Sequence, residues 1–473
     1  MSQLFPYQEV GADFLAKRRL ALLADEMGLG KTVQAIRGLD RIHAKKVLVI
    51  CPSVAKINWL REFEEWAAVS RKYKVCQELI DLPDNETSVI CSFEFATENH
   101  PYLKSLGFDV LVVDEAHYLK EHGTKRSSAI LGKNGIARGV KRIWFLSGTP
   151  APNHPGELWL MLYSFGLTKL KYNDFLEKFC LTKKTSYGLK VIGANRQAIP
   201  ELQQLLKPLM LRRLKDEVMK ELPPITYNHI FVEPGEVRIE VMPSFVEYYF
   251  PVDRREELFE IVHKQEKLIS DVLLNLKRPE GRDALPVIQS MWDSVSTMRR
   301  YVGLQKLQPA IDIIKSNFKY NAYQYNKLVI FAIHTDVIET LRKELREFNP
   351  VTLYGKTPPE KRQKRIDKFQ NNPKCKIFIG NIRAAGVAIT LTAANNILFI
   401  EQDWVPGNNA QAVMRCHRIG QKKPVFVRFL ALDNSIDKHI MKILKAKTRD
   451  LTEIFDQNIL QSTQQNDKHS KQL

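Results

Sequence analysis

Short apolar runs rich in β-branched residues recur along both halves of the chain, and each ends in small or polar residues. The helical stretches between them give the rhythm of a parallel sheet covered by helices. Ligands bind such sheets where the strands end. The pattern therefore predicts an α/β fold with two parallel-sheet lobes. The expected strands are KVLVICP, TSVICS, DVLVVDEAH and RIWFLSGTP in the first half, and KLVIFAIH, PVTLY, CKIFIG, NNILFIE and VFVRFLAL in the second.

The β pattern fades between the two halves, from about 156 to 318. Apart from the short run YNHIFVE, this segment has the periodicity of helices rich in Leu, Lys and Glu, most clearly at 255–277. Pro223-Pro224 and residues 278–286 interrupt it. We expect a first lobe at 1–155, mainly helical insertions at 156–303 with the connection between lobes near 223–235, a second lobe at 304–455, and a polar, flexible tail at 456–473.

Composition places the chain among soluble globular proteins. Its 473 residues suit roughly two or three domains, and 44% hydrophobic and 26% charged residues are ordinary values. No apolar run approaches the ~18 to 20 residues of a membrane helix, and the start resembles no secretory signal. The six cysteines form no Cys-x-x-Cys pair, which argues against a zinc site and a disulfide framework. We expect an intracellular protein without a membrane partner, in the cytoplasm (a host's, if viral) or in the nucleus if eukaryotic.

The net charge indicates which class of molecule the protein could bind. Seventy-one Lys and Arg against 53 Asp and Glu leave +18, with a pI near 9.4. Such an excess attracts polyanions over long distances. A basic surface alone can serve solubility, so the charge indicates nucleic acid only beside a motor for it.

The stretch LLADEMGLGKT nearly matches a phosphate-binding loop, which has glycine, four residues, then Gly-Lys-Ser/Thr. Asp25 stands where the first glycine is expected. An apolar run precedes the loop and a helical pattern follows, so backbone N–H groups and a helix N-terminus would face the phosphates. Lys31 would neutralise the β and γ phosphates, and the Thr32 hydroxyl would bind Mg²⁺. The alternative is a glycine turn that arose by chance.

The run VLVVDEAH ends in two adjacent carboxylates, Asp114 and Glu115. Metal-assisted ATP hydrolysis needs such a pair at a strand end, Asp114 to hold Mg²⁺ and Glu115 to orient the attacking water. In isolation, two solvated carboxylates would be the ordinary interpretation. The glycine loop upstream favours the catalytic one.

The second half supplies cationic groups in QAVMRCHRIGQ. Gln411, Arg415 and Arg418 follow at spacings of four and three, which predicts one face of a helix. Arginines on such a face can reach a γ-phosphate across a cleft. On their own, two helical arginines are more often a solvated or phosphate-binding face.

Taken in order, the motifs resemble those of superfamily two helicases. They are PYQ, DEMGLGKT, DEAH, LSGTP, IRAAGVAITLTAA and QAVMRCHRIGQ. More narrowly, the chain resembles the Swi/Snf-type DNA translocases from Leu4 to Lys447, and in that family the glycine loop carries aspartate at the place of Asp25. The resemblance implies two RecA-like lobes with inserted helical segments, and ATP with Mg²⁺ bound in the cleft between them.

The resemblance also implies site residues. ATP hydrolysis would use Lys31, Asp114, Glu115, Gln411, Arg415 and Arg418. The nucleotide would be held by Gln8, reading the adenine, and by Asp25, Glu26, Met27, Gly28, Leu29, Gly30, Lys31 and Thr32. Nucleotide state would be coupled to lobe movement by His117, Ser147, Gly148 and Thr149. DNA contacts would fall on Ser53, Asn58, Trp59, Asn381 and Arg383. For Trp59, a buried aromatic at a helix start is an equal alternative.

Two further segments, RRYVGLQKLQPAIDII and LYGKTPPEKRQ, resemble the members that remodel stalled forks and anneal strands. A compact motor of this kind also resembles bacterial or bacteriophage enzymes that regress forks or migrate branches. We therefore expect a monomeric, ATP-dependent DNA translocase or helicase for DNA repair, recombination or replication, acting on forked or branched DNA by fork regression, branch migration or strand annealing. The alternatives are a processive duplex-unwinding helicase, a DNA-binding scaffold with a degenerate nucleotide site, and, less favoured, an RNA helicase. No segment identifies a protein partner.

Overall fold

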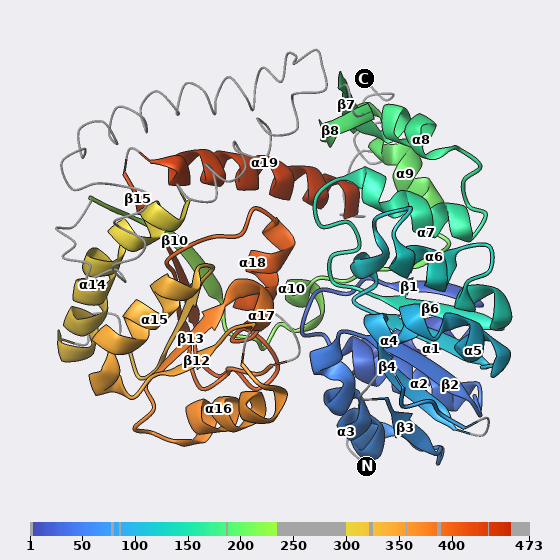
Figure 1. Ribbon diagram of the computed structural model, residues 1–473, viewed down its shortest axis with the longest axis horizontal. Coiled ribbons are helices and arrows are strands. Elements are labelled where there is room, and N and C mark those ends of the chain that lie inside the picture. The colour runs from blue at the N-terminus through green and yellow to red at the C-terminus, as the bar shows by residue number, and fades with distance from the viewer. Residues whose placement is uncertain are drawn as a thin grey trace, which may run out of the picture.

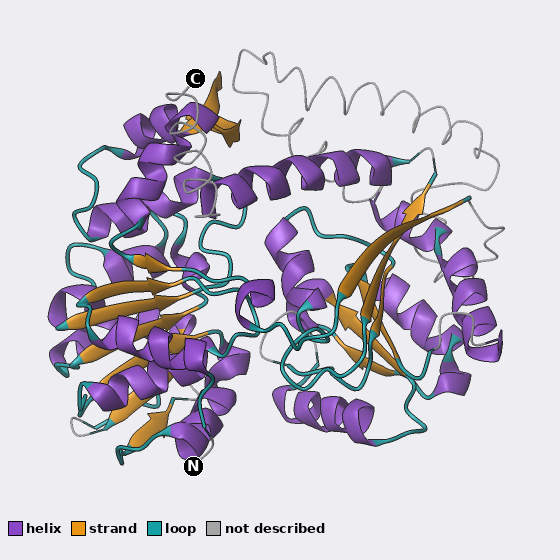
Figure 2. Cartoon of the chain, turned by 180° about the vertical axis from the view of Figure 1, so that it is seen from behind, coloured by secondary structure: helices purple, strands orange, loops and turns teal. Residues whose placement is uncertain are grey.

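The computed structural model describes residues 3–76, 80–84, 87–185, 188–233, 299–320, 325–355, 357–385, 389–433 and 435–455. Two α/β lobes lie side by side, each a parallel sheet with helices packed against it (Figures 1 and 2). The prediction of two parallel-sheet lobes is therefore confirmed. The expected helices at 255–277 and the tail at 456–473 lie outside the described residues.

Seven strands form the sheet of the first lobe in the order β3-β4-β2-β5-β6-β1-β9, and every neighbouring pair is parallel. The strands are β1 (Leu20–Leu23), β2 (Val47–Cys51), β3 (Tyr73–Val75), β4 (Ser88–Ser92), β5 (Val110–Asp114), β6 (Arg142–Leu146) and β9 (Met210–Leu211). The helices are α1 (Pro6–Ala16), α2 (Lys31–Arg41), α3 (Lys56–Trp66), α4 (Phe93–Glu98), α5 (His100–Ser105), α6 (Lys125–Leu131), α7 (Trp159–Ser164), α8 (Tyr172–Phe179), α9 (Ile199–Leu206) and α10 (Lys215–Val218).

Six strands form the parallel sheet of the second lobe in the order β10-β15-β14-β11-β13-β12. The strands are β10 (Ile225–Val232), β11 (Leu328–Ala332), β12 (Val351–Leu353), β13 (Ile377–Asn381), β14 (Asn396–Phe399) and β15 (Val425–Leu432). The helices are α14 (Leu307–Tyr320), α15 (Thr335–Glu344), α16 (Pro359–Asn371), α17 (Ile382–Ala385), α18 (Pro406–Val413) and α19 (Ile436–Phe455).

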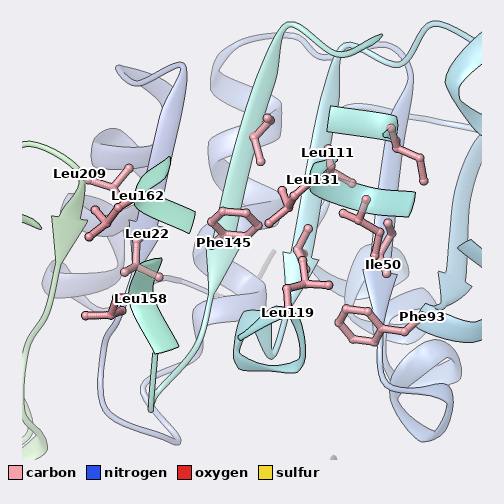
Figure 3. Close-up of a cluster of buried hydrophobic side chains, with 14 of the residues drawn as sticks. Leu22, Ile50, Phe93, Leu111, Leu119, Leu131, Phe145, Leu158, Leu162 and Leu209 are labelled. Carbon is pink, nitrogen blue, oxygen red and sulfur yellow. The ribbon is translucent and has the colours of Figure 1, made fainter. Parts of the chain in front are cut away.

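The central strands form because they are buried on both faces. In the first lobe, one layer of apolar side chains packs between the sheet and α4 to α9, and Figure 3 shows part of it around Leu22, Leu111 and Phe145. A second layer, with Trp59 and Trp144, packs on the opposite face against α1, α2 and α3. Strands buried on both faces become continuous apolar runs, which is why the sequence pattern identified them.

The segment between the lobes is less helical than expected. Residues 180–185 and 188–194 form an antiparallel pair, β7 (Cys180–Thr185) and β8 (Gly188–Ala194). The expectation of mainly helical insertions missed this hairpin, because its residues are mostly exposed or half-buried and its lysines, Lys183, Lys184 and Lys190, mark no buried face. The expected run YNHIFVE is a strand, β10, and pairs with β15 along its length.

The last described helix joins the two lobes. At its start, Ile436, Ile440 and Leu444 pack beside Leu432 of the second lobe. At its end, Ile454 and Phe455 are buried in the apolar layer of the first lobe. Figure 1 shows α19 crossing from one lobe to the other. None of the helices within the described ranges is both long and apolar enough to cross a membrane.

Candidate active site between the two lobes

The glycine loop connects β1 to α2. Gly28 and Gly30 have φ of 89° and 72°, a left-handed conformation that other residues adopt only with strain. Lys31 begins α2, and its ammonium donates to the backbone oxygens of Asp25 (2.7 Å) and Glu26 (3.3 Å). The ammonium is thus folded back over the loop beside the N-terminus of α2, where a phosphate would be stabilised.

Asp25 is structural in this loop. Its carboxylate is fully buried and accepts hydrogen bonds from Arg213 Nε (2.9 Å) and Gln34 Nε2 (3.0 Å). An aspartate at the place of the usual glycine therefore ties the loop to α2 and to the segment after β9. Arg213 was not among the site residues expected from the sequence, although it lies in the arginine-rich run LMLRRLKDEV.

Gln8 lies on α1, directly against the glycine loop. Its amide donates to the backbone oxygen of Leu29 (3.4 Å), and its carbonyl accepts from the backbone N–H of Phe5 (3.1 Å). A side chain at Gly30 would meet Gln8 Nε2 at 2.4 Å, so only glycine permits this approach. The placement suits a residue that contacts the nucleotide, and adenine recognition stays a prediction.

Asp114 and Glu115 end β5 beside the loop. Asp114 accepts from Trp59 Nε1 (2.9 Å) and from the backbone N–H of Glu115 (2.9 Å), while Glu115 adopts φ of 51°. Burial and the adjacent Glu115 charge raise the pKa of Asp114 to about 6. The pKa of Glu115 is lowered although burial opposes this, because His117 donates to it and Lys31 is near.

The Asp114 carboxylate fits the magnesium ion expected from the sequence. Mg²⁺ in nucleotide sites is held by one or two protein oxygens together with phosphates and water. A cation bound beside Asp114 would stabilise its charged form, which burial and the Glu115 charge disfavour. Thr32, one residue beyond Lys31, is the second predicted ligand.

The predicted coupling residues lie close to the site, and one of them, His117, contacts the Glu115 carboxylate. His117 Nδ1 lies 3.2 Å from Glu115 Oε2 and 3.2 Å from Ser147 Oγ. A side chain at Gly148 would lie 3.4 Å from the Lys31 ammonium. Thr149 faces Gly407 of the second lobe, so this turn contacts both the loop and the opposite lobe. Their part in coupling stays a prediction.

The second lobe presents Gln411, Arg415 and Arg418 toward the first. Gln411, on α18, places Nε2 at 3.5 Å from Glu115 Oε2. The prediction that all three share one helical face was wrong, because α18 ends at Val413 and both arginines lie in the turns that follow. Bends after the helix, closed by hydrogen bonds to the Val413 carbonyl, bring the arginines to the cleft instead.

Positive charge is concentrated where the lobes meet. Burial lowers the pKa of Lys31 and, with the neighbouring Arg418, lowers the pKa of Arg415 to about 10. Burial also lowers the pKa of Arg418, although Glu62 opposes this. Buried cations whose charged forms are disfavoured are stabilised by an anion placed among them. The group therefore suits a polyphosphate.

The glycine loop itself contacts the second lobe. Met27 is buried in the apolar cluster of that lobe, beside Ile389 and Met414. A side chain at Gly28 would lie 3.3 Å from Arg418 Cβ. Residues of both lobes thus surround the expected position of the phosphates.

The residues predicted to contact DNA differ in how far their side chains are exposed to solvent. Ser53 and Asn58, before and within α3, are exposed. Trp59 is 1% exposed and donates to Asp114, which matches the buried alternative weighed for it. Asn381 accepts from the backbone N–H of Arg383 (3.1 Å), and the exposed Arg383 side chain pairs with Asp403 (2.8 Å). DNA binding by these residues stays a prediction.

Comparison with known proteins agrees with this arrangement. The SNF2-related domain family model matches residues 7–276, and the helicase conserved C-terminal domain matches residues 305–420. The chain is similar to a SWI/SNF-related matrix-associated actin-dependent regulator of chromatin subfamily A-like protein 1 homolog from Caenorhabditis elegans, with 28% identity over 94% of this chain and 61% of that protein. It is also 28% identical to the DNA annealing helicase and endonuclease ZRANB3 from Bos taurus, over 95% of this chain and 40% of that protein.

The chain thus spans less than two thirds of these relatives' lengths. Among solved structures, the Sulfolobus solfataricus SWI2/SNF2 ATPase core in complex with dsDNA aligns with 22% identity over 96% of this chain and 97% of that chain, with a TM-score of 0.43. The first family model covers more than half of this chain, and its bounds contain the glycine loop and the paired carboxylates. The chain belongs to the SNF2-related family.

Proposed function

We propose that this protein is an ATP-driven DNA translocase that rearranges forked or branched DNA. The observation that carries the proposal is the approach of the two lobes around one set of groups, with Gln411 of the second lobe 3.5 Å from Glu115 of the first. Hydrolysis in such a site depends on both lobes, so it can be linked to their relative movement.

Each side chain of the site has a role in this proposal. Lys31 and the backbone N–H groups of the loop bind the β and γ phosphates. Thr32 and Asp114 hold Mg²⁺, which neutralises charge on the phosphates when bound. Glu115 orients and polarises the attacking water, aided by Gln411. The charge that develops in the transition state is stabilised by Arg415 and Arg418.

In this proposal the two lobes bind the DNA alternately, and this alternation produces movement along it. Closure of the lobes around ATP and their opening after product release change the distance between the two DNA-contacting surfaces. Contacts that go mainly to the DNA backbone allow movement on any sequence. The net charge of +18 supports a polyanionic partner. A DNA-handling enzyme of this kind would act inside the cell.

Branched DNA is favoured by the resemblance to compact fork-remodelling members and by the similarity to the relative named as a DNA annealing helicase and endonuclease. A processive duplex-unwinding helicase on the same motor is the second candidate. A scaffold with a degenerate nucleotide site is disfavoured, because Lys31, Glu115 and Arg418 are all in place.

The test is ATP hydrolysis with equal-length single-stranded, duplex, forked and four-way-junction DNAs, with Lys31→Ala as the inactive control. Strongest stimulation by fork or junction, with rearranged products, is the expected result. Equal stimulation by plain duplex would indicate a general translocase. No stimulation by any DNA would contradict the proposal.

A further inference from the structure

Lys215, the first residue of α10, connects the lobes at the centre of the molecule, where Figure 1 shows α10 between them. It follows β9 of the first sheet, yet its ammonium donates to the backbone oxygen of His417 (2.5 Å) and contacts the sulfur of Met414, both in the second lobe. The side chain is almost completely buried, at 4% exposure. A lysine of one lobe is therefore held in the interior by the other.

The Lys215 ammonium also lies over the glycine loop. A side chain at Gly28 would lie 3.3 Å from both Cε and Nζ of Lys215. The backbone N–H of Lys215 donates to Glu26 Oε2 (2.7 Å), which fixes the start of α10 beside the loop. Because the loop's own N–H groups are the expected phosphate ligands, the ammonium lies beside the expected position of the phosphates.

The surroundings of this ammonium compensate its charge poorly. Among the described residues, no carboxylate lies within 4.0 Å of Lys215 Nζ, whose partners are a carbonyl and a thioether. Burial lowers its pKa to about 7; Glu26 opposes this, and Lys31 and Arg418 add to it. A buried cation in such a position is costly unless an anion joins it.

We propose that Lys215 is a further phosphate-binding residue, which exchanges the His417 carbonyl for the terminal phosphate of a nucleoside triphosphate. This assignment rests on the proposed function, because it requires the nucleotide in the cleft. The exchange frees the segment after α18 from α10 when a triphosphate is bound. A diphosphate, which lacks the terminal group, leaves the contact in place. Lys215 thereby distinguishes the two nucleotides and transmits the difference to the second lobe.

Lys215→Gln tests the proposal, because the amide can still donate to the His417 carbonyl while the charge is lost. Equilibrium dissociation constants for a non-hydrolysable ATP analogue and for ADP are measured without DNA. We expect Lys215→Gln to weaken the analogue by about tenfold or more, the size of a lost charge-assisted hydrogen bond, and ADP by less than about threefold. Lys215→Arg, which keeps the charge, should retain most of the discrimination. Lys220→Gln, at a nearby exposed lysine, should match the wild type.

The outcomes separate this proposal from the broader one. A wild-type protein that binds ATP, with an unchanged ratio of the two affinities in Lys215→Gln, overturns the phosphate role and makes Lys215 a fixed connection between lobes. The same conclusion follows if both affinities fall equally together with the melting temperature. If the wild type binds no nucleotide, the proposed function itself falls.

Discussion

At the scale of single residues, Asp25 shows how a departure from a motif can be a structural requirement. The standard loop has glycine there, but the buried Asp25 carboxylate pairs with Arg213 and accepts from Gln34. Asp25→Gly restores the standard motif and should still destabilise the protein by about 3 kcal/mol, because Arg213 then loses its buried partner. Urea unfolding followed by tryptophan fluorescence measures the change.

The double variant Asp25→Gly/Arg213→Met is the matched control for that prediction. Removing both charges leaves no uncompensated ion, so the double variant should lose less stability than the sum of the two single variants. Additive losses would mean that the two side chains stabilise the loop independently.

Glu115 gives a second prediction at this scale. Glu115→Gln keeps the shape of the side chain but removes the charge that polarises water, so ATP turnover should fall at least about 100-fold. Nucleotide binding and DNA binding should remain, measured by equilibrium titration, because Lys31 and the loop are unchanged. Glu64→Gln, at an exposed position of α3, is the control and should turn over normally. Normal turnover in Glu115→Gln would remove Glu115 from the role of orienting water.

At the scale of elements, α19 makes a testable connection between the lobes. Phe455 is 4% exposed in the first lobe's apolar layer, and the Arg212 guanidinium lies 5.4 Å from its ring centroid. Phe455→Ala should detach the end of α19, because the burial of this ring is a large part of what holds it. We expect faster amide exchange in the last turns of α19 and weaker stimulation of ATP turnover by DNA.

Lys445→Ala serves as the control, because Lys445 is exposed on the same helix. If Phe455→Ala leaves exchange in α19 unchanged, the helix is held by its contacts with the second lobe alone. If exchange rises while stimulation by DNA is normal, α19 is a structural connection without a part in coupling.

How far the sequence predicts each element depends on the range of the interactions that form it. Buried parallel strands such as β5 are continuous apolar runs, and the glycine loop is a local motif. Both could therefore be predicted directly from the sequence. The hairpin of β7 and β8 was missed because its exposed lysines follow no buried pattern. The end of α18 was missed because the spacings of four and three between Gln411, Arg415 and Arg418 fit a helix, but they do not show where the helix ends.

The site residues that the sequence missed are defined by distant partners. Arg213 binds Asp25 across 188 positions of the chain, and Lys215 contacts His417 across 202. No local spacing carries that information. The run LMLRRLKDEV shows only that cationic residues occur among apolar ones. The fold is needed to bring Arg213 and Lys215 to the glycine loop.

At the scale of the whole molecule, the net charge and the burial of the nucleotide site predict that DNA binding and ATP turnover differ in their sensitivity to salt. The chain carries +18, and DNA contacts that neutralise phosphates release counterions. If about six to ten phosphates are contacted, DNA affinity should fall roughly 10³- to 10⁵-fold between about 50 and 200 mM salt. Turnover without DNA should change far less, because the cations around Lys31 are buried and screened weakly.

The response of DNA binding to salt can be tested at a single side chain, Arg383. Its side chain is 72% exposed but already paired with Asp403, so it either serves a DNA phosphate or only neutralises that buried carboxylate. If it binds phosphate, Arg383→Gln should reduce the slope of log affinity against log salt by about one, measured by fluorescence anisotropy with labelled duplex. An unchanged slope with a lower melting temperature would assign Arg383 to Asp403 alone. The grip of the second lobe on DNA would then lie elsewhere on its surface.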